Sequence, residues 1–326
     1  MSSGPILVVV DAPDSSVPAH ALECVGLALR LAAAAGSTVE AALYAAAGSP
    51  AARELAEHGV ARVHCAPVQA DSDTVEYRVG PLAGLCRDRA AIAVLVPHGT
   101  TGMDLVPRLG FRLGGAAITG CVDASIENGV PLFTRPCHGG TAREQLEARR
   151  LPAVASVRAG VCEAAPRDPG RSGEVLQWAA DPDPPRQRVA GRRMDPVEGI
   201  RLEDARIIVA GGRGLEGPDG FRVLETLATA LGGAVGASRV PCDLGWCPHS
   251  WQIGLTGKTV TPDVYFAVGI SGAGHHMAGC GGARTIVAIN TDAQASIFDD
   301  ARFGVVGDYR KIIPALTDAI GRARSA

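Results

Sequence analysis

Eight residues in the second half of the chain, Gly269–His276 ("GISGAGHH"), combine three glycines, a serine and two adjacent histidines after the apolar run Val264–Val268. Such residues suit a phosphate-binding loop, a metal-binding histidine pair, or a loop moulded around a flat ligand. The metal site is disfavoured, because adjacent side chains diverge at a helix start and no second ligand pair has suitable spacing. A structural histidine stays an open alternative. The position after a strand makes the loop a candidate ligand site.

A second glycine pattern, Gly212–Gly217 ("GRGLEG"), formally matches the dinucleotide fingerprint G-x-G-x-x-G between a predicted strand and a predicted helix. That fingerprint also requires an acidic residue about 20 positions later, to hold a ribose. The next predicted strand instead ends in Ser238 and Arg239, which argues against ordinary NAD binding. Arg213 is suited to contact a phosphate or a ring, and a tight turn with a solvated arginine is an equally open interpretation.

The long connection Ser238–Asp263 has little periodicity, and loops of this length in compact domains are usually functional. Its stretch Gly254–Lys258 ("GLTGK") superficially resembles a P-loop, but the leading glycine spacing is missing and Pro262 follows instead of a helix. We therefore exclude hydrolysis of nucleoside triphosphates. Backbone amides and the hydroxyl of Thr256 are suited to line a polar heterocycle.

Two more polar residues, Asn290 and Asp308, end predicted apolar strands. Each alone is more commonly a helix cap. Together with Arg213, Ser238 and Ser271 they predict a crevice lined for one large polar ligand.

The elements that must position these loops are short apolar runs alternating with helical patterns, which is typical of parallel sheets covered on both faces. A helix is predicted over 21–36, ending at Gly36. Strands are predicted in the first half over 5–11, 38–45, 61–67, 91–99, 132–140 and 152–160. The second half predicts strands over 205–214, 234–238, 263–269, 285–290 and 303–308, and helices over 221–232 and 309–323.

Between the two halves, residues 163–204 are rich in Pro, Gly, Asp and Arg and poor in periodicity, which predicts a linker or wrapping segment. The expected fold class is α/β, with two doubly wound, mostly parallel-sheet domains. We expect an N-terminal domain with its polar linker over residues 1–190 and a second domain over residues 191–326.

Composition narrows the class of protein. Hydrophobic residues make up 47% of the chain and the net charge is -3, which gives no reason to expect nucleic acid or an anionic membrane surface as a partner. No apolar run approaches the roughly 18 residues that a membrane span requires. Nine scattered cysteines without a C-x-x-C pair are typical of reduced thiols, and the N-terminus lacks a signal-peptide pattern. We expect a cytoplasmic protein without membrane insertion. For Cys242 and Cys247 a structural role is favoured over a metal or redox role, because metal sites usually have tighter paired spacing.

Several stretches, in this order, resemble the α subunits of electron transfer flavoproteins, the family that includes the FixB proteins. They are "VAGGRGL", "GASR", "QIGLTGKTV", "PDVYFAVGISGA", "IVAINTD" and "FGVVGD" in the second half, and "VPHGTTGMDLVPRLGFRLG" and "LFTRPCHGG" in the first. The resemblance implies a flavin-binding, Rossmann-like C-terminal domain with noncovalent FAD. It also implies a heterodimer with a β subunit that packs on the N-terminal domain and carries an AMP. The chain would be an electron carrier rather than an enzyme, with flavin dehydrogenases as donors and a membrane quinone reductase or similar acceptor.

Carried over by position, Arg213 and Ser238 would hold the nucleotide or ribityl part of FAD, and Arg239 would lie against the isoalloxazine ring. Thr256 would hydrogen-bond near N5, Ser271 would contact the vicinity of the ring, and His276 would approach the C2 carbonyl. Asn290 and Asp308 would bind the adenosine end. The remaining residues expected in the site are Gln252, Ile253, Gly254, Leu255, Gly272, Ala273, Gly274, His275 and Tyr309. No catalytic residue and no metal ligand is expected.

The chain departs from the family pattern at Leu255 and His275, where glutamine is usual. The resemblance implies flavin or ribityl hydrogen bonds from those glutamines, and neither leucine nor histidine supplies the same amide group. Two other classes stay as alternatives: an NAD(P)-dependent oxidoreductase that uses "GRGLEG", and a flavin-free nucleotide-binding module.

Overall fold

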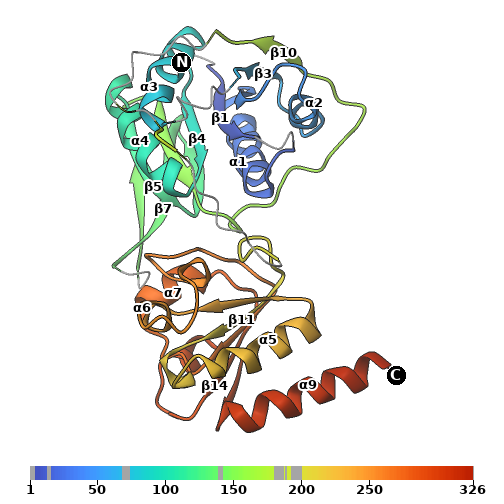
Figure 1. Cartoon of the computed structure of the whole chain (residues 1–326). Helices are drawn as coiled ribbons and strands as arrows, with labels where there is room; N and C mark the ends of the chain where they lie inside the picture. The colour runs from blue at the N-terminus through green and yellow to red at the C-terminus, as the bar shows by residue number, and fades with distance from the viewer. Residues whose placement is uncertain are drawn as a thin grey trace. The chain divides into compact units, whose positions relative to one another are not determined.

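The computed structural model describes residues 4–12, 16–67, 74–138, 142–179, 187, 189–191 and 200–325. The chain divides into two compact units (Figure 1). Unit 1 comprises Met1–Cys137 and Ala142–Arg193, and unit 2 comprises His138–Thr141 and Met194–Ala326. Part of the predicted linker, residues 180–186, 188 and 192–199, lies outside the described residues.

The main sheet of unit 1 has seven parallel strands in the order β10-β3-β2-β1-β4-β9-β5. Their bounds are β1 Ile6–Asp11, β2 Val39–Tyr44, β3 Arg62–Cys65, β4 Ala93–Pro97, β5 Ala116–Cys121, β9 Ala153–Val157 and β10 Glu174–Gln177. Alternate residues of β1 point to opposite faces, so Ile6 and Val8 pack in one core and Leu7 and Val9 in another.

Helices cover both of these faces. Helices α1 (Ala19–Ala35) and α2 (Pro50–Glu57) pack on the face of Ile6, and α3 (Val75–Asp88) and α4 (Thr100–Leu113) pack on the face of Leu7. The predicted end of α1 at Gly36 is confirmed, because that glycine adopts φ 61° and its N–H caps the last turn. The expectation of a doubly wound α/β unit is confirmed.

A three-stranded antiparallel sheet, β6 (Asp123–Glu127), β7 (Val130–Cys137) and β8 (Ala142–Glu147), was not predicted, apart from β7. The turn between β6 and β7 is Asn128–Gly129, with φ 51° and 79°. Asn-Gly is the strongest short hairpin signal in a sequence, so these residues could have revealed the hairpin.

The predicted linker also contains an unpredicted strand. β10, "EVLQ", pairs in parallel with β3 at the edge of the main sheet, so this part of the linker belongs to the fold of unit 1. Only its third residue is even partly buried, which explains why its apolar pattern is weak.

Unit 2 holds one sheet of five parallel strands in the order β12-β11-β13-β14-β15. Their bounds are β11 Ile207–Gly211, β12 Ala234–Ala237, β13 Val264–Val268, β14 Ile286–Asn290 and β15 Phe303–Val306, all at predicted positions. Helices α5 (Asp219–Leu231) and α9 (Tyr309–Ser325) share a core with one face, and α7 (Gly274–Cys280) and α8 (Ile297–Asp300) share a core with the other.

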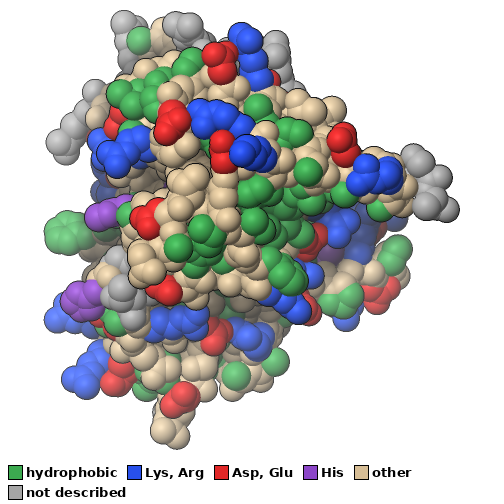
Figure 2. Space-filling view, turned by 90° about the horizontal axis from the view of Figure 1, so that it is seen from below, with side chains coloured by type: hydrophobic (Ala, Val, Ile, Leu, Met, Phe, Trp, Pro, Cys, Tyr) green, Lys and Arg blue, Asp and Glu red, His purple; other side chains and the backbone are tan. Residues whose placement is uncertain are grey.

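None of the described helices is long and apolar enough to cross a membrane. On the face seen in Figure 2, Lys and Arg side chains are interspersed with Asp and Glu, so that face carries no extended patch of one charge.

Candidate functional site

The predicted site residues gather at one edge of the unit 2 sheet. All five strands are parallel, so their carboxyl ends meet at that edge. The chain passes from β11 to β12 on one side and then to β13 on the other, which makes the ends of β11 and β13 the topological switch point. Arg213 follows β11, Ser238 follows β12, Ser271 follows β13, Asn290 ends β14 and Asp308 follows β15.

The glycines after β11 and β13 pack against each other. The N–H of Gly212 donates to the carbonyl of Val268 (2.9 Å), and the N–H of Gly214 donates to that of Gly269 (3.0 Å). A Cβ on Gly212 would lie 2.1 Å from the Gly269 oxygen, closer than real contacts allow. Gly269 itself adopts φ 60°. A Cβ on Gly269 would in turn lie 2.9 Å from the Gly214 backbone, so the neighbouring loop requires glycine at this position of "GISGAGHH".

A second close packing joins the loop after β13 to the start of α8. Gly272 adopts φ 90°, and a Cβ there would lie 2.2 Å from the backbone nitrogen of Ile297. The carbonyl of Ser271 accepts hydrogen bonds from the Ile297 N–H and from the Ser296 hydroxyl, both at 2.9 Å. These contacts leave the Ser271 side chain exposed at the edge.

The stretch Gln252–Lys258 is held by hydrogen bonds along both of its sides. The Gln252 side-chain amide donates to the Thr256 hydroxyl (2.9 Å), and the N–H of Leu255 donates to the carbonyl of His275 (2.7 Å). Lys258 forms an ion pair with Glu203 at 3.0 Å. Leu255 is 57% exposed and Thr256 is also exposed, so this loop presents one apolar and one hydroxyl side chain.

His276 is turned into the protein and is 7% exposed. Its Nδ1 lies 3.1 Å from the carbonyl of Ile253, which can only accept, so Nδ1 carries the proton. Nε2 then accepts from the Tyr265 hydroxyl at 2.9 Å. Burial lowers the pKa of His276 to about 4, although the hydrogen bond to Ile253 opposes the shift. Both ring nitrogens are thus engaged inside unit 2, while the neighbouring His275 is exposed.

The low pKa of His276 predicts that unit 2 loses stability in mild acid. Because the folded-state pKa lies below the ordinary value of about 6.5, the unfolded chain binds a proton that the folded chain refuses. Stability is present above about pH 6.5 and is lost as the pH falls toward about 4. From about pH 7 to about pH 5 we expect a loss of about 2 kcal/mol from this group.

Hydrogen exchange of β13 and α7 peptides as a function of pH measures this loss, and His276→Gln should flatten the slope. His275→Gln is the matched control at the adjacent, exposed position. An identical slope in the His276 variant would contradict the assignment.

Asn290 and Asp308 already serve the local structure. The Asn290 side-chain amide donates to the carbonyl of Ile270 (2.9 Å), and its oxygen accepts from the Asp292 N–H (3.0 Å). Asp308 Oδ1 accepts from the Arg310 N–H at 2.9 Å, in the first turn of α9. The capping alternative is thus realised for Asp308. Tyr309 is buried, and its hydroxyl donates to the carbonyl of Leu215 at 3.0 Å.

Two arginines at the edge expose their charge. Arg213 begins the short helix η3 (Arg213–Leu215), and no ion pair joins it to another described residue. Arg239 begins α6 (Arg239–Asp243) and pairs with Asp243 across one turn at 3.0 Å. This pair is solvent-exposed and therefore weak, so Arg239 can exchange its partner for a ligand at little cost. In the described residues no group of three or more His, Cys, Asp or Glu side chains could hold a metal.

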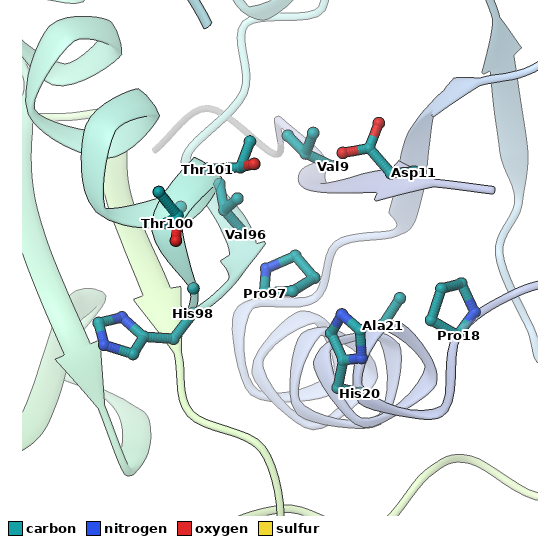
Figure 3. Close-up of a pocket in the computed structure, with 12 residues that line it drawn as sticks. Val9, Asp11, Pro18, His20, Ala21, Val96, Pro97, His98, Thr100 and Thr101 are labelled. Carbon is teal, nitrogen blue, oxygen red and sulfur yellow. The ribbon is translucent and has the colours of Figure 1, made fainter. Parts of the chain in front are cut away.

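Unit 1 has a crevice of about 400 Å³ at its own switch point, between the ends of β1 and β4 and the start of α4 (Figure 3). Two of its titratable groups have partners: Asp11 pairs with Arg78 at 2.6 Å, and His98 Nδ1 lies 2.9 Å from the Ser156 hydroxyl. Burial, with a smaller contribution from the charge of Arg158, lowers the pKa of His98 to about 4. None of the predicted site residues lines this crevice.

Comparison with known proteins covers both units. The family model "Electron transfer flavoprotein domain" matches residues 6–183, and "Electron transfer flavoprotein FAD-binding domain" matches residues 201–281. The chain is 37% identical over 310 residues to "Electron transfer flavoprotein subunit alpha" of Thermoanaerobacterium thermosaccharolyticum, covering 93% of this chain and 94% of that protein. Proteins of the same description from Megasphaera elsdenii (34%; 98% and 97% covered) and Bacillus subtilis (39%; 73% and 73% covered) are also similar.

Proposed function

Because the chain belongs to the electron transfer flavoprotein α-subunit family, we propose that its FAD lies along the carboxyl edge of the unit 2 sheet. The chain is an FAD-binding subunit that acts in electron transfer. The observation that carries the placement is the overlap between the FAD-binding family match, residues 201–281, and the loops that hold Arg213 through His276. The matched range ends before Asn290, Asp308 and Tyr309. Their assignment to the FAD site is supported by their position at the same edge of the sheet.

The residues present at this edge fit such a cofactor. Exposed guanidinium groups at Arg213 and Arg239 suit a pyrophosphate and a ring that gains negative charge. Hydroxyls at Ser238, Thr256 and Ser271 supply further hydrogen bonds. When bound, FAD supplies the redox chemistry by taking up and releasing electrons.

We assign the residues as follows. Arg213 and Ser238 hold the nucleotide or ribityl part, while Arg239 lies against the isoalloxazine ring and stabilises negative charge on it. The Thr256 hydroxyl, oriented by Gln252, donates to the ring, and Ser271 lies near it.

Asn290 and Asp308 accept hydrogen bonds from the adenosine end. Asp308 uses Oδ2 for this contact, because its Oδ1 caps α9. The backbone of Gly272, Ala273 and Gly274 approaches the ring from β13.

We propose that His276 supports the flavin site indirectly, without a direct hydrogen bond to the flavin. Its ring donates to Ile253 and accepts from Tyr265, so it holds the backbone of Ile253 and Gly254 in place. A direct contact with the cofactor requires Nε2 to exchange the Tyr265 hydroxyl for it. His275 and Leu255 are both exposed beside this segment, and the Leu255 N–H donates a hydrogen bond to the His275 carbonyl.

Family membership implies a β subunit as partner. In the FAD domain, the edge strand β15 also exposes Phe303 (57%) and Val306 (59%), and we propose this apolar edge as a further surface that the partner covers, in addition to the N-terminal domain. We place the AMP of the heterodimer in that β subunit, and we propose residues 1–190 as the domain that packs on it and residues 191–326 as the FAD domain.

Flavin dehydrogenases are the proposed electron donors and a membrane quinone reductase the acceptor, which makes the protein a carrier rather than an enzyme that transforms a substrate. Its nine cysteines form no disulfide, which supports a reducing cytoplasm.

The direct test is to co-express the chain with a β subunit and to measure bound FAD by its absorbance. We expect FAD in a one-to-one ratio with the heterodimer and its reduction by a flavin dehydrogenase. A colourless protein that oxidises a substrate with NAD would instead support the NAD-dependent alternative, which the missing acidic residue at Ser238 disfavours.

Arg239→Gln provides a test at one residue. Loss of a charge-assisted contact is worth about 1.5–3 kcal/mol, so FAD affinity should fall about tenfold or more. The matched control is Arg206→Gln, which removes an exposed arginine that pairs with Asp263 (2.7 Å) just before β11, at the amino edge of the sheet. Equal FAD affinity of the two variants, measured by equilibrium dialysis, would contradict the role of Arg239.

A further inference from the structure

Two cysteines of unit 2, Cys242 and Cys247, form a thiol pair. Their sulfur atoms lie 3.5 Å apart, and Cys242 Sγ also lies 3.7 Å from the carbonyl of Pro248. Cys242 is 2% exposed, at the end of α6, and Cys247 is partly exposed. The pair is therefore open to small solutes from the side of Cys247.

The backbone brings the two residues together. The N–H of Gly245 donates to the carbonyl of Cys242 (3.0 Å), and Gly245 adopts φ 70°, which reverses the chain after α6. The N–H of Trp246 then returns to the carbonyl of Pro241 at 2.9 Å. Trp246 and Trp251 pack against the core shared with α5, which anchors the segment on both sides of Cys247.

The thiols are chemically unequal. The hydrogen bond from the Cys247 thiol lowers the pKa of Cys242, because the donated proton stabilises a thiolate there, and the same bond raises the pKa of Cys247. Buried cysteines without a neighbouring thiol behave in the opposite way, since burial raises the pKa of Cys86 and of Cys280 to about 12. The thiolate is the form that reacts, and solutes reach the pair past the partly exposed Cys247. Thiolate character at Cys242 and access from Cys247 together make this pair more reactive than Cys86 or Cys280, which have neither.

We propose that Cys242 and Cys247 are an oxidative modification site, at which hydrogen peroxide converts the dithiol reversibly into a disulfide. The sulfur separation of 3.5 Å has to shorten by roughly 1.5 Å to reach the length of a disulfide bond, a movement within one short loop.

The reaction balances with one peroxide per pair. The Cys242 thiolate attacks one peroxide oxygen, the O–O bond breaks, Cys242 becomes a sulfenic acid, and the other oxygen leaves as hydroxide and takes up a proton. The Cys247 sulfur then attacks the Cys242 sulfur, its proton and the sulfenic hydroxyl leave as water, and the S–S bond forms. Two electrons pass from the sulfurs to the peroxide. Cys247 thus protects Cys242 from irreversible oxidation.

The thiol pair is close in the chain to two residues of the proposed FAD site. Arg239 lies in the same five-residue helix, α6, as Cys242, and Gln252 directly follows Trp251. A disulfide that closes the segment from Cys242 to Cys247 restrains the backbone that carries Arg239. The inference concerns thiols and needs no flavin, so it stands or falls independently of the proposed function.

The test uses the full chain in complex with its β subunit, treated with increasing hydrogen peroxide and then alkylated with iodoacetamide before digestion. Trypsin releases Val240–Lys258 as one peptide that contains both cysteines and no internal Lys or Arg. After peroxide treatment we expect this peptide to carry neither alkyl group and to be two hydrogen atoms lighter than the dithiol peptide. Reduction with dithiothreitol before alkylation should restore both alkyl groups. Cys137, a partly exposed cysteine of unit 1, is the internal control and should react at least about tenfold more slowly.

In Cys247→Ser the resolving sulfur is missing, so dimedone should trap a sulfenic acid on Cys242 in that variant and much less in the unsubstituted chain. Cys137→Ser is the matched control and should leave the disulfide yield unchanged. The proposal is overturned if both cysteines of the peptide stay alkylated while Cys137 is oxidised. It is also overturned if Cys242 proceeds to sulfinic acid in the unsubstituted chain.

Discussion

Replacing Glu40 by glutamine should destabilise unit 1 by about 3 kcal/mol, because the change removes a buried carboxylate that holds two arginines and a histidine together. Glu40 lies on β2 and is 1% exposed. Its carboxylate accepts from His64 (2.7 Å), Arg89 (2.8 Å) and Arg62 (3.1 Å). A glutamine side chain keeps the volume but loses the charge, and its NH₂ group faces donors.

The same cluster predicts an acid limit for unit 1. Burial raises the pKa of Glu40, but hydrogen bonds from His64, Arg89 and Arg62 outweigh it and hold the pKa at about 2. Since the folded-state pKa is depressed, this stability is present above the ordinary pKa of about 4.3 and is lost as the pH falls through about 2. The loss over that window is about 3 kcal/mol, and Glu40→Gln should remove it.

Hydrogen exchange of β2 and β3 peptides in the full chain measures both effects for unit 1. Glu174→Gln is the matched control, because Glu174 binds Arg62 of the same cluster at 2.8 Å but is about half exposed. That variant should lose no more than about 1 kcal/mol. Equal destabilisation by the two substitutions would show that burial of Glu40 does not govern the cluster.

Replacing Gly272 by alanine should destabilise unit 2 by about 3 kcal/mol and reduce retained FAD about tenfold or more. An alanine at φ 90° is strained, and its Cβ would lie 2.2 Å from the Ile297 nitrogen and 2.6 Å from the Ile297 Cα. The loop after β13 must then move away from the start of α8, which breaks the hydrogen bonds to the Ser271 carbonyl.

Gly232→Ala separates strain from collision. Gly232 ends α5 with φ 67°, and no atom lies within 4 Å of the position of its Cβ. We expect a loss of about 1 kcal/mol and unchanged FAD content. Urea unfolding followed by exchange of β13 peptides, together with FAD absorbance, measures both variants. An equal loss in both would mean that the contact with Ile297 is unimportant.

Much of the fold follows from the sequence, because buried parallel strands leave continuous apolar runs and helices leave a periodic pattern. Both are local properties of the chain. The five strands of unit 2 and the end of α1 at Gly36 were predicted on that basis. β8 and β10 leave no apolar run in the sequence, because most of their residues are exposed, and β6 is signalled only by the Asn128–Gly129 turn that follows it.

The sequence also predicts part of the candidate site. Arg213, Ser238 and Asp308 each follow a parallel strand, so the sequence alone places them at one edge of the sheet. The partners of "GISGAGHH" do not follow from the sequence. Gly269 and Gly272 face the backbone of Gly214 and Ile297, distant in the chain, and His276 turns inward to Tyr265 and Ile253. The sequence by itself thus determined which residues stand at the edge. Only the tertiary structure decided which of these side chains point outward, because their orientation depends on contacts with loops that are distant in the chain.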